Sequence, residues 1–394
     1  MKAGGKGEAS TGLVREPEAA GSISLGRLLL AFLKIGSLGF GGGMAVIALM
    51  EQELARKRRL ISADEFVHGA ALGQILGPFT ANTAIFIGYR LFGLPGGLLC
   101  AAAFLAPSVA LVIALSYLYF EYHSIPALQG VVAGLGPVVI ALIFSAGWSI
   151  ARNVIRTPAA WLIAALAAAA GIARLNSIWV LLAAGAAGLF LGRGDGAAAA
   201  TPARPSAAPV FAIVSISLPA MGSLLLVAAT FLKIGFVFFG GGFVLVPVLH
   251  HQLVTQLHWL TPREFLDGVA ISNLTPGPIA VLATFAGYRV AGVAGALAAT
   301  AALFAPGAAL MLMISRQYAR LRDDRRAKHF LNGINPAVTG LIFAAAILLA
   351  PAGLASWRGI LLSGASFLLL TRLRWPPALV LGIGAATGCL GVCP

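Results

Sequence analysis

The chain has 394 residues, of which 59% are hydrophobic and 10% are charged, and its mean hydropathy is +0.93. A soluble domain of this length needs a polar surface that this composition does not supply, so a water-soluble globular protein is excluded. The formal net charge of +14 does not indicate nucleic-acid binding, because the cations form short clusters between apolar segments. We therefore expect an all-α polytopic integral membrane protein that contacts the lipid bilayer.

The N-terminal tail, residues 1–24, is polar and lacks the apolar core of a secretory signal peptide, so we do not expect it to be cleaved as one. After it, apolar segments approach the ~20 residues that a membrane-spanning helix needs. Leu98–Phe120, Pro158–Gly171 and Val338–Leu349 are examples. These segments predict several helical membrane crossings.

The chain contains an internal duplication. The sequence Phe-Leu-Lys-Ile-Gly at Phe32–Gly36 recurs 199 residues later at Phe231–Gly235, and the same offset relates Gly88–Arg90 to Gly287–Arg289. Chance does not produce matches at one offset over more than a hundred residues, so we predict two copies of one transporter repeat. The expected organisation is the tail, repeat 1 at 25–192, a linker at 193–209 that is rich in Gly, Ala and Pro, and repeat 2 at 210–394.

The charged loops predict that the two repeats have opposite orientations in the membrane. Repeat 1 carries the cationic cluster Arg56–Arg59, whereas the matching residues 250–259 of repeat 2 contain no Lys or Arg. The bias then reverses, because repeat 2 carries six cations between Arg316 and Lys328 and the matching loop 117–128 has none. Since short cationic loops stay in the cytoplasm, matching loops fall on opposite sides and the repeats are inverted, as in many secondary transporters.

Each repeat is also expected to contain a broken or re-entrant helix. Opposite loop positions require an odd number of crossings, and the segment between the loops is too short for three full spans. One span, Gly93–Ser116, with a broken element over Glu65–Tyr89 satisfies both conditions, and Glu264–Tyr288 is its counterpart. The predicted breaks lie at Gly77-Pro78 and at Pro276-Gly277-Pro278, where a helix does not continue easily.

The candidate binding residues lie beside these breaks and in two glycine triplets within apolar sequence. Unwound glycines leave N–H groups free to face an anion, although glycines also permit close helix packing. A lysine seven residues before each triplet could supply positive potential or extend to the membrane interface. The neutral polar residues suit a tetrahedral oxyanion, or they satisfy backbone groups freed by the break, and the two arginines could anchor the helix or gate the path. The candidate substrate-binding residues are Lys34, Gly41, Gly42, Gly43, Gln74, Thr80, Asn82, Arg90, Lys233, Gly240, Gly241, Gly242, Asn273, Thr275, Pro276, Gly277, Pro278 and Arg289.

Catalytic and metal-binding motifs are absent from the sequence, so we expect neither an enzyme nor a cofactor or metal site. Glu65 and Glu264 match across the repeats, and their spacing from Ser62 and Thr261 favours helix capping over proton coupling. The histidines His68, His250 and His251 could titrate near neutral pH, with only their residue type in favour. No feature of the sequence sets the oligomeric state.

Taken in order, these motifs resemble the long, two-domain form of the chromate ion transporter family. The resemblance is carried by Phe231–Gly235, the glycine triplet after Phe239, Glu264-Phe265, Pro276–Pro278 and Gly287–Arg289, and repeat 1 has the same series apart from its break. The resemblance implies export of chromate, a tetrahedral dianion, across the inner membrane of a bacterium without ATP hydrolysis. Leu76–Phe79 departs from the pattern of Thr275–Pro278, so the two halves are expected to contribute unequally.

The expected function is therefore a secondary transporter that exports chromate and confers chromate resistance. A carrier of sulfate or another anion, an importer, and a non-transporting scaffold or lipid-handling membrane protein remain as alternatives. A scaffold would not need repeated helix breaks or lysines within apolar sequence, which favours transport.

Overall fold

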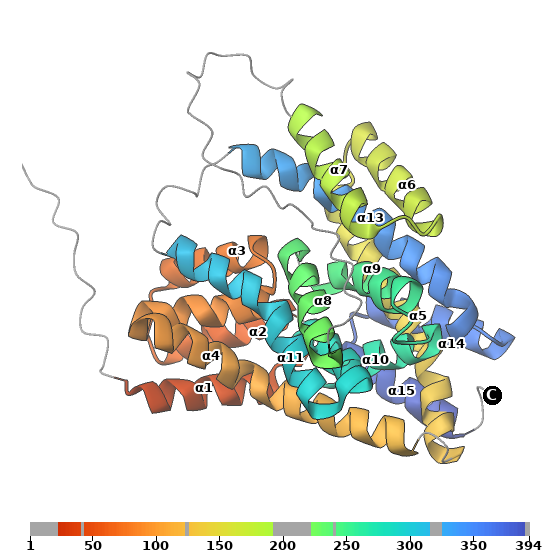
Figure 1. The fold of residues 1–394 in the computed structure, drawn as a ribbon, viewed down its shortest axis with the longest axis horizontal. Coiled ribbons are helices and arrows are strands. Elements are labelled where there is room, and N and C mark those ends of the chain that lie inside the picture. Colours follow the sequence, from red (N-terminus) through yellow and green to blue (C-terminus); the bar gives the residue numbers. More distant parts are fainter. Residues whose placement is uncertain are drawn as a thin grey trace, which may run out of the picture.

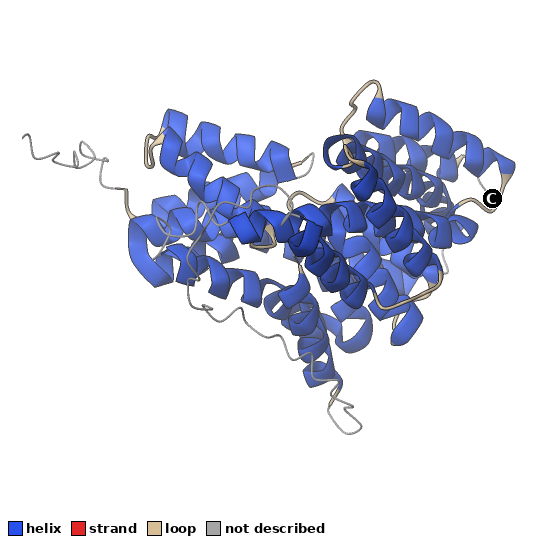
Figure 2. Ribbon diagram, turned by 90° about the horizontal axis from the view of Figure 1, so that it is seen from above, coloured by secondary structure: helices blue, strands red, loops and turns tan. Residues whose placement is uncertain are grey.

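A computed structural model describes residues 23–40, 43–122, 126–191, 222–238, 242–315 and 325–390. These residues contain helices and no strands (Figure 2). Four helices are long and apolar enough to cross a membrane, within Phe79–Tyr122, Gln129–Val154, Ile279–Ser315 and Gly333–Gly353. The predicted all-α polytopic membrane fold is confirmed.

The helices of repeat 1 follow one another with short connections. Their bounds are α1 Leu25–Leu38, α2 Gly43–Met50, the π-helical turn η1 Glu51–Lys57, α3 Ala63–Ile75, α4 Phe79–Tyr122, α5 Pro126–Val154, α6 Pro158–Ile172 and α7 Ser177–Leu191. A kink at Phe92–Gly93 divides α4, so its second part begins where the span Gly93–Ser116 was predicted.

Repeat 2 has matching helices in the same order, with two 3-10 turns that repeat 1 lacks among the described residues. Their bounds are α8 Ser223–Val237, the 3-10 turn η3 Gly242–Val244, α9 Leu245–Leu249, the π-helical turn η4 His250–Gln256, α10 Pro262–Leu274, the 3-10 turn η5 Ile279–Val281, α11 Leu282–Ser315, α13 Arg325–Gly353, α14 Trp357–Thr371 and α15 Pro377–Cys389. The kink of α11 at Ala291–Gly292 matches that of α4 at the same offset of 199.

The same local signals start the matching helices. The side chain of Thr157 accepts a hydrogen bond from the backbone N–H of Ala160 before α6, and Ser356 accepts one from Gly359 before α14. Each cap satisfies one of the N–H groups that a helix start leaves open and contributes about 1 kcal/mol. The duplicated sequence therefore specifies helix starts at duplicated positions.

The two repeats intertwine to form two helix groups, each with members from both repeats. In the first group α8 and α4 pack on α11, while α1 and α3 pack on α4. In the second group α6 and α7 of repeat 1 pack on α13 of repeat 2, and α14 and α15 of repeat 2 pack on α5 of repeat 1. Figure 1 shows α1 to α3 on the left, α4 running from there along the lower edge toward the right, and α5 to α7 with α13 and α14 on the right.

A contact between two residues that occupy the same position in the two repeats locates the approximate two-fold axis that relates the repeats. The rings of Phe144 and Phe343, which differ by the repeat offset, lie 5.7 Å apart between α5 and α13. A residue touches its own counterpart only near the axis that relates the copies. The axis therefore passes between α5 and α13, and reciprocal contacts are expected elsewhere.

The outer helices present large apolar side chains. On α6, Trp161, Leu162 and Leu166 are all more than 60% exposed, and on α14 Trp357 and Leu361 are equally so. Exposed apolar surface of this extent needs lipid or protein around it. These helices therefore form part of the lipid-facing surface.

Candidate functional site

Both predicted helix breaks are present, and each contains a glycine with positive φ. The helix α3 ends at Ile75 and α4 begins at Phe79, with Gly77 at a φ of +120° between them. In repeat 2, Gly277 has a φ of +109° between α10 and η5. This conformation is open to glycine and costly for other residues, so these two glycines make the breaks possible.

The breaks are not identical. The helices before them end at matching residues, Ile75 and Leu274, but the positive-φ glycines are 200 residues apart rather than 199. Repeat 2 resumes through the 3-10 turn Ile279–Val281, whereas repeat 1 resumes directly as α-helix at Phe79. The break of repeat 2 is therefore one residue longer. This difference in structure occurs where the sequences of the two repeats differ, at Leu76–Phe79 and Thr275–Pro278.

Each break packs against the other repeat. The backbone N–H of Gly277 donates a hydrogen bond to the carbonyl oxygen of Gly39, just after α1, at 3.0 Å. In the reciprocal contact, a Cβ on Gly77 would lie 2.6 Å from the carbonyl oxygen of Phe238, the counterpart of Gly39 just after α8. The two breaks and the ends of the two first helices thus meet across the approximate two-fold axis.

The second halves of α4 and α11 each contact the break of the other repeat. The hydroxyl of Ser108 on α4 donates to the carbonyl oxygen of Pro276 in the break of repeat 2. Its counterpart on α11 is Gly307, where a Cβ would lie 2.8 Å from Pro78 and 3.3 Å from the amide of Asn82. The lack of a side chain at Gly307 therefore allows Pro78 and Asn82 to approach α11.

Two polar side chains at this point have no hydrogen-bond partner among the described residues. They are Thr80, through its hydroxyl, and Asn82, through both atoms of its amide, and the two residues are only 2% and 1% exposed. A buried polar group without a partner costs about 1–3 kcal/mol, so such groups are rare and indicate positions where a water, an ion or another ligand can bind. Their hydroxyl and amide N–H groups can donate hydrogen bonds to an oxyanion.

The polar residues before the break of repeat 2 are satisfied by their own helix. Ser272 donates to the carbonyl oxygen of Gly268 at 2.7 Å, and Asn273 donates to that of Val269 at 2.8 Å. Thr275 donates to the carbonyl oxygen of Ser272 at 3.1 Å. These side chains stabilise the end of α10, so at the two breaks the unused side-chain hydrogen-bond donors among the described residues belong to repeat 1.

The triplet glycines that the structure describes lie against the breaks. A Cβ on Gly43 would meet the ring of Phe79 at 3.3 Å, and one on Gly242 would meet Ile279 at 2.4 Å. The remaining predicted glycines lie outside the described residues, namely Gly41, Gly42, Gly240 and Gly241.

Neither of the two predicted lysines is buried in the core. Lys34 is exposed and Lys233 is half-buried, whereas their helix neighbours Ile35 and Ile234 are buried in the core. A hydrogen bond from Lys57 lowers the pKa of the Glu53 carboxyl below its usual value, and the charge of Lys34 adds to this effect. Lys34 therefore lies near the cationic turn η1, in the arrangement expected of a lysine that extends to an interface.

We expect Lys34→Ala and Lys233→Ala each to reduce anion uptake by less than about fivefold, because Lys34 is exposed, Lys233 is only half-buried, and charges that solvent reaches contribute little locally. Uptake by each variant should be measured in everted vesicles with matched amounts of inserted protein. A reduction of about a hundredfold in either variant would place that lysine in the substrate path.

The two arginines form ion pairs at the surface. Arg90 pairs with Glu65, and Arg289 pairs with Glu264 at 3.3 Å. Glu264 also completes a capping box with Thr261, and Ser62 caps α3 by accepting from the N–H of Glu65. The predicted capping role is confirmed for Glu264, whereas at the start of α3 Ser62 is the cap and the Glu65 carboxylate binds Arg90 instead; Gln74 is exposed on α3.

Sequence reasoning missed a buried ionic group between the repeats. Asp267 on α10 is 1% exposed and accepts a hydrogen bond from the hydroxyl of Tyr119 at 2.8 Å, while Arg263 lies 3.5 Å away. Asp267 was only one of several acids near membrane segments in the sequence. The usable signal was its spacing of four residues after Arg263, which places both side chains on one helix face.

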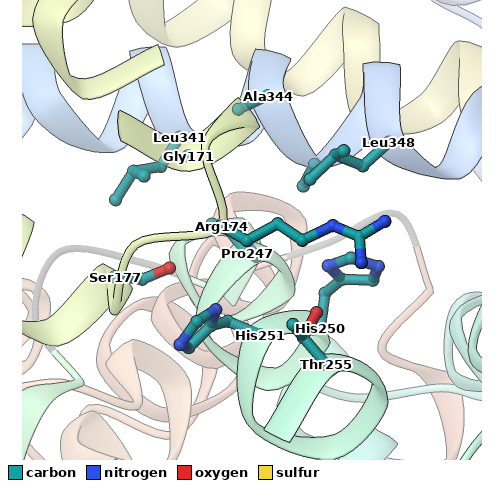
Figure 3. Close-up of a pocket in the computed structure, with 11 residues that line it drawn as sticks. Gly171, Arg174, Ser177, Pro247, His250, His251, Thr255, Leu341, Ala344 and Leu348 are labelled. Atoms are coloured by element: carbon teal, nitrogen blue, oxygen red, sulfur yellow. The ribbon is translucent and has the colours of Figure 1, made fainter. Parts of the chain in front are cut away.

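A small cavity lies apart from the breaks, between the α6–α7 turn of repeat 1 and η4 of repeat 2 (Figure 3). Its polar lining includes Arg174, Ser177, His250, His251 and Thr255. Both histidines are 7% exposed, so neither lies in open solvent. Among the described residues, no group of three or more His, Cys, Asp or Glu could hold a metal ion.

The sequence matches the family described as Chromate transporter at residues 26–189 and 225–389, once in each half. The chain is 32% identical over 349 residues to a chromate transport protein of Cupriavidus metallidurans, covering 84% of this chain and 86% of the relative. It is 34% identical over 341 residues to a chromate transport protein of Pseudomonas aeruginosa, covering 83% and 82%. A probable chromate transport protein of Synechococcus elongatus is 30% identical over 350 residues, covering 83% and 85%. No solved structure matches the chain.

Proposed function

Because the chain belongs to the chromate transporter family, whose pattern occurs in both of its halves, we propose that it exports chromate from the bacterial cytoplasm. It is a multi-pass membrane transport protein and not an enzyme. We place it in the inner membrane, where export of chromate would confer chromate resistance. The names of its relatives, chromate transport proteins, support the choice of substrate.

The observation that carries the binding site is the pair of unpartnered side chains where the two breaks meet. Thr80 and Asn82 are buried there without hydrogen-bond partners among the described residues. Chromate is a tetrahedral dianion with four oxygen acceptors, so it can use several N–H and O–H donors at once. We therefore place the chromate site beside these two residues.

The backbone of the break adds to this site. The helix α4 begins at Phe79, and the first N–H groups of a helix have no partner within it. These groups carry the positive end of the helix dipole, which favours a bound anion. Neutral donors and a helix dipole can bind an anion without a buried cation.

The reciprocal contacts between the repeats support a transport cycle in which the site opens to one side of the membrane at a time. Each break touches the end of the first helix of the other repeat, so movement of one repeat against the other changes both contacts. In inverted repeats, such movement opens the site to one side as it closes the other. The loop charges support this inverted orientation for residues 25–192 and 210–394.

The membrane potential favours export. Moving a charge across the membrane changes its free energy by ~2.3 kcal/mol per 100 mV, so a dianion leaving a negative-inside cell gains about twice that amount. Export of chromate therefore does not require ATP. Sulfate, which has the same shape and charge, is the alternative substrate.

The proposed function predicts uptake of labelled chromate into everted membrane vesicles that contain this protein. The uptake should saturate, increase with an inside-positive potential, and be absent from vesicles without the protein. Sulfate should compete weakly if chromate is the substrate and strongly if the site accepts both anions. Absence of uptake in vesicles with verified insertion would contradict chromate export.

A further inference from the structure

The buried carboxylate of Asp267 lies on α10 of repeat 2 but is bound by repeat 1. The hydroxyl of Tyr119, near the end of α4, donates to its Oδ2 at 2.8 Å. Arg263, one turn earlier on α10, lies 3.5 Å from its Oδ1, and Oδ1 accepts no hydrogen bond from the described residues. The carboxylate is thus incompletely satisfied within a contact that joins the two repeats.

Other ionisable groups on the neighbouring elements are engaged elsewhere. Glu264 on α10 pairs with Arg289 of α11, and His250 of η4 packs its ring against Phe265. A guanidinium N–H of Arg263 also donates to the carbonyl oxygen of Ala352 on α13 at 3.2 Å. One partly shared cation therefore faces Asp267, and Tyr119 is the group that reaches it from repeat 1.

Position 267 carries a carboxyl group in repeat 2 only. The counterpart of Asp267 in repeat 1 is His68, and the counterpart of Arg263 is Asp64. The glutamates that follow positions 64 and 263, Glu65 and Glu264, instead have one role in common in both repeats, as partners of the matching arginines Arg90 and Arg289. A carboxyl group at 267 is therefore not required by the helical framework that the repeats share.

We propose that Asp267 binds and releases a proton during transport, and that its protonation state controls the contact between α4 of repeat 1 and α10 of repeat 2. Hydrogen bonds to a charged carboxylate are about twice as strong as those between neutral groups. The ionised group therefore holds Tyr119 firmly, and one proton added to the carboxylate weakens the link between repeats that move against each other. This inference rests on the proposed transport function.

The physical setting suits a proton-binding group. A carboxylate taken out of water is costly unless charge and hydrogen bonds compensate fully, and here one oxygen lacks a hydrogen bond. Ionisable groups buried within membrane proteins commonly mark proton and ion paths. From the sequence alone, Glu65 and Glu264 are candidates for proton coupling, and in this proposal Asp267 has that role instead.

The test uses the purified full-length protein in liposomes with an imposed potential, recording labelled chromate and internal pH together. Wild type should move protons with chromate. Asp267→Asn keeps the shape of the side chain and its ability to accept from Tyr119, and it should abolish the proton movement and the pH dependence of chromate uptake. Asp64→Asn, a change at an exposed acid of repeat 1, should behave as wild type.

Tyr119→Phe gives a second test that does not depend on folding of the Asn variant. It leaves the carboxyl in place and removes a hydrogen bond that stabilises the ionised form, so the pH dependence of uptake should shift to higher pH. Proton movement by Asp267→Asn equal to that of wild type would overturn the proposal. Chromate transport by wild type without protons would overturn it too, leaving chromate export intact, whereas absence of chromate transport would overturn both.

Discussion

Asn82→Asp is expected to reduce chromate uptake at least about tenfold. The change keeps the size of the side chain and replaces the amide N–H donors with a negative charge at the point where the dianion is proposed to bind. Two like unit charges about 4 Å apart repel by about 4 kcal/mol at the effective dielectric of protein sites, and a tenfold loss needs only about 1.4 kcal/mol. Initial rates of labelled chromate uptake into everted vesicles measure the effect.

The chain offers a matched control at Asn153. This residue is exposed near the end of α5, where its amide donates to the carbonyl oxygen of Ser149 at 3.1 Å. Asn153→Asp makes the same chemical change away from the breaks and should leave uptake within about twofold of wild type. Equal rates for Asn82→Asp and wild type, at equal insertion, would remove Asn82 from the site.

Gly77→Ala is expected to destabilise the protein by about 2–5 kcal/mol. Its φ of +120° strains any residue with a side chain, and the added Cβ would lie 2.6 Å from the carbonyl oxygen of Phe238. The neighbouring atom is backbone at the end of α8, so it cannot rotate away as a side chain could. Thermal denaturation of the purified protein in detergent should show a clearly lower midpoint.

Gly93→Ala separates the effect of backbone strain at positive φ from the effect of the close contact of the added Cβ. Gly93 also has a positive φ, +64°, at the kink of α4, but nothing lies within 4 Å of a Cβ placed there. Its substitution should cost only the conformational strain, about 1–3 kcal/mol. If Gly77→Ala were no more destabilising than Gly93→Ala, the close contact between the break of repeat 1 and repeat 2 would be contradicted.

The sequence predicted the fold class, the duplication and the position of both breaks. Composition alone required helices in lipid, and proline with glycine marked where α3 and α10 end. The predicted start of a span at Gly93 coincides with the kink of α4, although the kink itself was not predicted. The fold class, the duplication and the breaks depend on composition or on short stretches of sequence, so they can be predicted from one sequence.

The meeting of the two breaks was not predictable from the sequence. It depends on contacts between residues far apart in the chain, such as Ser108 with Pro276 and Gly277 with Gly39. The same holds for the distinction between Asn82 and Asn273, which look alike in sequence but differ in whether a backbone carbonyl is within reach. Which face of its helix Lys34 occupies likewise depends on packing.

The most direct test of the central claim is equilibrium binding of labelled chromate to the purified protein, comparing wild type with Asn82→Asp and Asn153→Asp. A site at the meeting of the two breaks predicts saturable binding by wild type and Asn153→Asp, and none by Asn82→Asp at the same concentrations. Saturable binding of equal affinity by all three proteins would contradict it and would place the chromate site elsewhere in the molecule.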